Sequence, residues 1–206
     1  MQFEPIAREY GAFEAGYDYE LRSNWPSVLG LLPSSPATVL DYGSGNGTYA
    51  SILSRAGYEV TATDISPAMI GQLQDESVRK LAWSYHDGSL PEKFEVIVAK
   101  LVVHFVEDLS KFAQVMRGQL DTAGKLIISV PHPDYSRPLV RAGESTYHRS
   151  IGTSALLATM IHRERAEYID TLKEAGLRLV KSDEPLNVDA LTNPPKRLNM
   201  LFEPIR

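Results

Sequence analysis

The chain has 206 residues, of which 43% are hydrophobic, so it can form one domain with a substantial core. It carries 21 basic and 26 acidic side chains, a formal net charge of −5, and no basic cluster, which argues against nucleic acid as a main partner. Cysteine is absent, which excludes disulfides, thiolate metal sites and a cysteine nucleophile.

The first residues are acidic and lack the basic and apolar regions of a signal peptide. The most apolar segment, 94–106, contains Glu95, Lys100 and His104 and is too short and too polar to span a bilayer. We therefore expect a cytoplasmic protein without a membrane span, whose oligomeric state stays open.

Aromatic and charged residues alternate over residues 4–32, which predicts two helices before the sheet, the second beginning near Asn24 and Pro26. Because these helices precede the first strand, we expect the core to form without them and residues 1–32 to act as a helical lid. Simple helix packing is the alternative. The rings whose polar tips suit a wet pocket edge are Tyr10, Tyr17, Tyr19 and Trp25.

A glycine-rich loop follows the first apolar run, which ends in Asp41. Glycines at 43, 45 and 47 permit a sharp turn and leave no Cβ between the backbone amides and a ligand at the start of the next helix. The Asp41 carboxylate would repel a pyrophosphate but suits an amino group or a sulfonium. Thr48 stands where a dinucleotide fingerprint needs glycine. The loop therefore predicts a cationic, ribose-bearing cofactor.

A second acid, Asp64, ends the β-branched run 60–64, about twenty residues after the glycine loop. A Rossmann-like unit places a carboxylate against ribose hydroxyls at this distance. Ser66 and Pro67 then fit a helix N-cap and first helical residue. Either acid alone is often only a helix cap, but the two at this spacing predict a ligand pocket.

Alternating strands and helices continue to the end of the chain and predict a doubly wound, mostly parallel α/β sheet whose ligands bind at the carboxyl ends of the strands. The predicted strands are 38–42, 58–63, 81–85, 95–99, 125–130 and 177–181, with 198–204 as a candidate last strand. The predicted helices are about 47–56, 67–75, 108–119 and 163–175.

Residues 37–64 resemble the cofactor-binding half of the class I S-adenosylmethionine (SAM)-dependent methyltransferases. The resemblance implies a Rossmann-like seven-stranded sheet with an antiparallel last strand. It also implies that Asp41 and the glycine loop hold the methionine end of SAM, that Asp64 holds the ribose, and that Ile65 packs on the adenine.

Two further positions match the same family. By the resemblance, Asp87 faces the adenine amino group with the Gly88 backbone beside it, although Asp-Gly is also a common surface turn. Lys100 departs from the small or amide residue that the family has there. Its backbone could still contact the cofactor, but its charge would be unfavourable near the sulfonium unless it points away. The cofactor-binding candidates are Tyr10, Asp41, Gly43, Ser44, Gly45, Asp64, Ile65, Asp87, Gly88 and Lys100.

Residues 129–133 and 162–185 resemble a small-molecule branch related to the quinone-biosynthesis methyltransferases. Segment 132–159 is unmatched; because it follows a strand end near the cofactor, it predicts a substrate-binding insertion, with a solvated surface loop as the alternative. Its candidate residues are Tyr135, Arg137, Arg141, Tyr147, His148 and Arg149. We thus expect a single domain with a lid (1–32), a cofactor-binding half (37–131), a substrate insertion (132–165) and a C-terminal part of the sheet (166–206).

Three histidines, His104, His132 and His162, are candidates for a general base, because imidazole titrates near neutrality. His104 and His132 are the candidate catalytic residues. Proximity and alignment alone can also accelerate an in-line methyl transfer. The histidines lack the spacing of metal ligands, so we expect no metal site.

The resemblance implies an enzyme that transfers the methyl group of SAM to a small-molecule acceptor, whose identity and methylated atom stay open. The alternative is a non-catalytic SAM-binding protein that acts as a sensor or partner subunit. A nicotinamide-dependent oxidoreductase ranks below both, because it would lack the third glycine and would have to tolerate Asp41.

Overall fold

The computed structural model describes residues 20–150, 157–185 and 195–205. A seven-stranded sheet in the order β3-β2-β1-β4-β5-β9-β8 forms the centre of the molecule. Its strands are β1 (Thr38–Tyr42), β2 (Glu59–Asp64), β3 (Arg79–Ala82), β4 (Phe94–Lys100), β5 (Leu120–Pro131), β8 (Leu177–Asp183) and β9 (Arg197–Pro204).

The pairing within this sheet is mostly parallel. Parallel ladders join β1 to β2 and β4, β2 to β3, and β4 to β5. The last strand, β9, runs antiparallel to both β5 and β8. The predicted doubly wound α/β sheet and its antiparallel last strand are thereby confirmed. The carboxyl ends of β1 to β5 share one edge, where such sheets bind their ligands.

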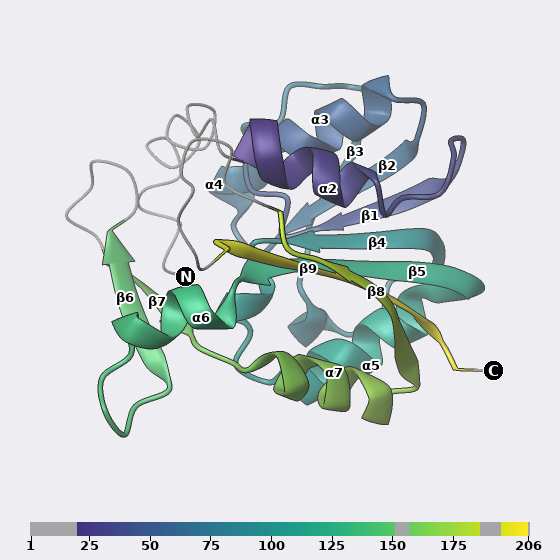
Figure 1. Ribbon diagram of the computed structural model, residues 1–206. Helices are drawn as coiled ribbons and strands as arrows, with labels where there is room; N and C mark the ends of the chain where they lie inside the picture. Colours follow the sequence, from purple (N-terminus) through teal and green to yellow (C-terminus); the bar gives the residue numbers. More distant parts are fainter. Residues whose placement is uncertain (1–19, 151–156, 186–194, 206) are drawn as a thin grey trace.

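Helices cover both faces of the sheet (Figure 1): α2 (Trp25–Leu29) and α3 (Thr48–Arg55) on one, and α5 (Leu109–Gln119) and α7 (Arg165–Glu174) on the other. Successive residues of a strand point to opposite faces, so each central strand serves two cores. In β1, Val39 packs with α2 and α3, whereas Leu40 packs with α5 and α7.

The segment before β1 contributes to the core. A π-helical turn (Glu20–Asn24) leads into α2, where Trp25 and Val28 are buried. The Trp25 ring lies 4.7 Å from the Tyr49 ring of α3, centroid to centroid. Trp25, Val28 and Leu31 are therefore core residues, which differs from the expectation that the core forms without residues 1–32. The first expected helix, with Tyr10, Tyr17 and Tyr19, lies outside the described residues.

Two predicted elements end elsewhere than expected. The helix predicted at 67–75 is only α4 (Pro67–Ile70), since glycine follows directly and favours ending a helix. The strand predicted at 81–85 ends at Ala82, because Ser84 caps a 3₁₀ turn, Tyr85–Asp87. Within the described ranges, no helix is long and apolar enough to cross a bilayer.

The unmatched segment contains structure that the sequence did not predict. A short helix, α6 (Pro133–Ser136), and a 3₁₀ turn (Arg137–Leu139) follow β5. An antiparallel hairpin comes next, formed by β6 (Thr146–Ser150) and β7 (Leu157–Ile161). This hairpin lies next to α6, beyond the carboxyl end of β5 (Figure 1).

Candidate cofactor and acceptor site

The glycine loop between β1 and α3 has a backbone that only glycine adopts readily. Gly43, Gly45 and Gly47 have φ angles of 69°, 59° and 78°. A Cβ on Gly43 would lie 2.4 Å from a Val102 methyl group, and one on Gly47 would lie 2.5 Å from a Leu73 methyl group. A side chain is thus excluded at Gly43 and Gly47, where Val102 and Leu73 already fill the space.

Asp64 links the second strand to this loop. One of its carboxylate oxygens accepts a hydrogen bond from the Gly45 N–H at 2.9 Å, and the other accepts one from the Ser66 N–H at 2.8 Å. The Ser66 hydroxyl in turn accepts from the Met69 N–H and caps α4, as predicted. A carboxylate oxygen accepts more than one hydrogen bond, so Asp64 keeps capacity for ligand hydroxyls.

Asp41 lies at the carboxyl end of β1, where its residue is only 3% exposed. The strand register places it opposite Ala62 of β2 and Val98 of β4. It is therefore flanked by strands on both sides, close to the start of the glycine loop. A buried carboxylate here favours a cationic ligand group.

A cavity of about 650 Å³ opens at the carboxyl ends of these strands, within the usual size range of small-molecule sites. The cofactor half and the hairpin both contribute to its wall. Ile65, a 44% exposed apolar side chain next to Asp64, offers a surface for a flat ring. The lining residues are Tyr42, Ile65, Ser66, Ser84, Tyr85, His86, Val102, Phe105, Val106, Glu107, Thr146, Thr159 and Ile161.

Asp87 stands at the edge of this region but already has a structural role. Its carboxylate accepts a hydrogen bond from the Ser84 N–H at 2.9 Å, which completes a capping box around the 3₁₀ turn. Gly88 follows with a φ of 85° and open space where a Cβ would lie. The structure therefore explains Asp87 as a turn residue, and its contact with adenine stays a prediction.

Lys100, at the end of β4, points into a buried ionic cluster. Its ammonium nitrogen lies 2.8 Å from a carboxylate oxygen of Glu20 and 3.8 Å from the centre of the Tyr49 ring. The other Glu20 oxygen accepts hydrogen bonds from Arg197, with both nitrogens at 2.7 Å. Burial alone would raise the pKa of Glu20, but the adjacent Arg197 and Lys100 cations lower it to about 2.

His104 is buried just after β4 and is poorly suited to act as a base. Burial lowers its pKa to about 3, and the nearby Arg197 and Arg163 cations add to this effect. Its Nδ1 atom has no hydrogen-bond partner among the described residues. His104 is consequently a neutral imidazole near pH 7.

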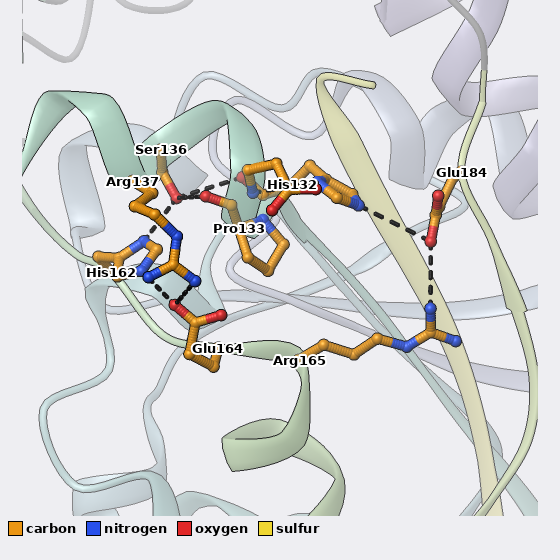
Figure 2. A network of polar contacts seen from close by, with 9 residues as sticks. His132, Pro133, Ser136, Arg137, His162, Glu164, Arg165 and Glu184 are labelled. Atoms are coloured by element: carbon orange, nitrogen blue, oxygen red, sulfur yellow. Dashed lines mark hydrogen bonds and ion pairs between the residues drawn. The ribbon is translucent and has the colours of Figure 1, made fainter. Parts of the chain in front are cut away.

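His132, the other catalytic candidate, begins α6 (Figure 2). Its Nδ1 atom accepts a hydrogen bond from the Asp134 N–H at 3.2 Å, which uses that lone pair for helix capping. Its Nε2 atom lies 3.7 Å from the Glu184 carboxylate, which Arg165 also contacts at 3.1 Å. Both histidines are buried; His104 lies in the 3₁₀ turn after β4, and His132 is the N-cap of α6.

Four side chains connect the two ends of the insertion through polar contacts, and Figure 2 shows them together. The Ser136 hydroxyl and His162 Nδ1 share a hydrogen bond of 2.8 Å. His162 Nε2 lies 2.8 Å from Glu164, whose carboxylate also pairs with Arg137 at 2.5 Å. We call Ser136, Arg137, His162 and Glu164 the insertion clamp, because they join the segment that follows β5 to the segment that follows β7.

Arg163, Glu20 and Arg197 are buried charged residues that were not predicted from the sequence. Arg163 is buried and donates hydrogen bonds to the backbone carbonyls of Val103 and Val106, which fixes the segment after β4. These arginines and Glu20 find their partners through distant parts of the chain, so no local pattern marks them. Among the described residues, no group of three potential ligands could hold a metal ion.

Comparison with known proteins places this geometry in a family. A family model described as a methyltransferase domain matches residues 13–182. The chain belongs to this methyltransferase family. Residues 13–182 form a class I SAM-dependent methyltransferase domain.

Solved methyltransferase structures share its fold. A SAM-dependent methyltransferase from Mesorhizobium loti superposes with a TM-score of 0.73 at 19% identity, covering 87% of this chain and 97% of that one. The N-methyltransferase NodS from Bradyrhizobium japonicum gives 0.66 at 18% identity over 93% and 99% of the two chains. The DhpI–SAH complex gives 0.73 at 18% identity over 99% and 95%. At these identities the likenesses show the fold alone.

A curated relative matches a smaller region. Hemagglutinin 1 of Eikenella corrodens is 34% identical over 79 residues, which cover 35% of this chain and 26% of that protein. The match thus spans about a quarter of the length of that relative.

The residues at the strand ends fit SAM. The glycine loop, the buried Asp41 carboxylate and the Asp64 carboxylate offer groups for the amino, sulfonium and ribose parts of that molecule. Ile65, exposed within the cavity wall, offers the apolar surface that a purine ring needs.

Proposed function

We propose that this methyltransferase acts on a small-molecule acceptor, which binds in the cavity between the cofactor half and the hairpin. The cavity itself is the observation that carries the proposal. It is about 650 Å³ in volume, and Thr146, Thr159 and Ile161 of the hairpin face the strand ends across it. A space of this size suits a metabolite.

Asp41 and the glycine loop, with Gly43, Ser44 and Gly45, would hold the methionine end of SAM, and Asp64 would hold the ribose. When bound there, SAM supplies a methyl carbon activated by a positively charged sulfur. Tyr10, Asp87 and Gly88 stay further candidates for cofactor contacts. The cavity wall around Ile65 and Phe105 would exclude water from the reacting groups.

Positioning is the main contribution that we assign to the protein. His104, with a pKa near 3, cannot accept a proton effectively at neutral pH. His132 commits Nδ1 to capping α6 and leaves only Nε2 for another role. In-line displacement at an activated carbon gains most from proximity and alignment, so an acceptor held in the cavity would need no side-chain base.

We further propose that residues 132–165 form the substrate insertion within a single domain. The insertion clamp supports this division, since it ties the two ends of the insertion beside the strand ends. The proposed relation to the quinone-biosynthesis methyltransferases rests on sequence motifs at 129–133 and 162–185 alone.

Methyl transfer can be tested with SAM carrying an isotopically labelled methyl group. The purified protein is incubated with this SAM and a pool of small metabolites, and products are separated by mass spectrometry. We expect a labelled small molecule and an equal amount of S-adenosylhomocysteine (SAH). A label that appears only in added protein or RNA would contradict the proposed acceptor class.

A further inference from the structure

Three charged side chains are buried together beside the proposed cofactor site. Glu20, Lys100 and Arg197 have side chains that are only 1%, 3% and 9% exposed. Burial of a charge is costly unless it is paired, and Glu20 pairs with both cations at 2.7 to 2.8 Å. Asn24 also donates a hydrogen bond to the Glu20 carboxylate at 2.7 Å.

The cluster holds one acid against two bases. Glu20 is ionised at neutral pH, because the Arg197 and Lys100 cations outweigh the effect of burial on its pKa. These three side chains together carry one unit of positive charge in a dry environment. Removing the Glu20 charge would leave two units, whereas removing the Lys100 charge would leave none.

Lys100 lies next to the residues proposed for the methionine end. In the parallel ladder of β1 and β4, Val98 is opposite Asp41, and Lys100 follows Val98 by two residues. Residues two apart on a strand share a face, so Lys100 points to the same side of the sheet as Asp41. Its ammonium lies over the ring of Tyr49, which belongs to the helix that begins at the glycine loop.

We propose that Glu20 determines how the site discriminates between the charged cofactor SAM and its neutral product SAH, by offsetting the charge of Lys100. This inference rests on the proposed function, because it requires the methionine end of SAM to lie beside Asp41 and the glycine loop. Two unit charges several ångströms apart in a partly buried site repel enough to change an affinity roughly tenfold or more.

The two ligands differ in the one property that matters here. SAM carries a sulfonium cation, whereas SAH carries an uncharged thioether in the same skeleton. Glu20 also connects residues 20–24 to the sheet through Lys100 and Arg197. Loss of this connection would weaken the binding of SAM and of SAH to the same extent. The ratio of the two dissociation constants therefore reports the charge effect and is insensitive to a purely structural one.

Calorimetry can measure both dissociation constants for the full-length protein and three variants. We expect Glu20→Gln to weaken the binding of SAM relative to that of SAH about tenfold, because the variant removes the negative charge that lies between Lys100 and Arg197. Lys100→Met should shift the ratio the opposite way, in favour of SAM. Asn24→Ala is the matched control, since it removes an uncharged hydrogen-bond partner from the same cluster. It should change both affinities equally.

The outcomes separate this inference from the proposed function. If the wild type binds both ligands and the ratio is the same in Glu20→Gln and Lys100→Met, the inference is wrong and the cofactor site stands. If the wild type binds neither ligand, the cofactor site itself is wrong, and the role of Glu20 falls with it. If Glu20→Gln does not fold, Lys100→Met still tests the inference, because its ratio of SAM to SAH dissociation constants should shift in favour of SAM.

Discussion

The backbone N–H of Gly45 donates a hydrogen bond to the Asp64 carboxylate at 2.9 Å, across 19 residues of sequence. This bond connects the glycine loop after β1 to the acid at the end of β2. The two motifs that indicate a cofactor are thus one physical unit. A change at Asp64 should affect the loop and the ligand together.

Replacing Asp64 with alanine should weaken SAH binding by about 1.5 to 3 kcal/mol, because hydrogen bonds from ribose hydroxyls to a carboxylate are charge-assisted. Calorimetry of the folded variant measures the loss. Asp170→Ala, which removes an exposed acid from α7, is the control and should bind like the wild type. Unchanged affinity in Asp64→Ala would refute the ribose assignment.

Asp41, together with Thr48 at the position where a dinucleotide fingerprint needs its third glycine, should make the site selective against nicotinamide dinucleotides. SAH at a hundred times its dissociation constant should add about 2.7 kcal/mol to the free energy of unfolding. NAD and NADP should add nothing, because Asp41 would face a pyrophosphate. Thermal-shift measurements compare the three ligands directly. Stabilisation by NAD but not by SAH would rule out the proposed ligand set.

His104 should make the protein less stable in mild acid. Its pKa is about 3 in the folded protein and ordinarily 6.5, so the unfolded chain takes up the proton first. The contribution of the neutral His104 to the free energy of unfolding is fully present above pH 6.5 and falls as the pH drops towards 3. Between pH 7 and pH 5 this amounts to about 2 kcal/mol. Denaturant unfolding should show that loss in the wild type and not in His104→Leu; equal losses in both proteins would contradict the burial argument.

The insertion clamp should hold the hairpin over the cavity. His162→Leu removes the hydrogen bonds of His162 to Ser136 and Glu164, each of which contributes about 1 kcal/mol. Hydrogen exchange should then become faster in β6 and β7, while amides of β4 and β5 keep their protection. Unchanged exchange in the hairpin would mean that the clamp does not restrain it.

Local sequence patterns were enough to predict the fold and the position of the glycine loop and the two acids at the carboxyl ends of the strands. The acid, the glycine loop and the second acid depend on residues close in sequence, and the sheet follows from alternating strands and helices. Asp41 and Asp64 consequently lie at adjacent strand ends, as the pattern indicates.

Contacts between residues far apart in the sequence could not be predicted from local patterns. Glu20, Lys100 and Arg197 are far apart in the sequence and meet only in the folded sheet, so the sequence did not indicate which partner the Lys100 charge would have. The hairpin was missed because β6 has a single buried side chain, Tyr147, and hence no hydrophobic alternation. Trp25 and Val28 did carry a signal, since their three-residue spacing is typical of a helix facing a core.

A crystal structure of the protein with SAH tests the central claim most directly. We predict that the ribose hydroxyls lie within hydrogen-bond distance of the Asp64 carboxylate, with the amino group of the homocysteine end beside Asp41 and the glycine loop. The adenine should lie in the cavity against Ile65. SAH bound elsewhere, with Asp41 and Asp64 making no contact to it, would contradict the account.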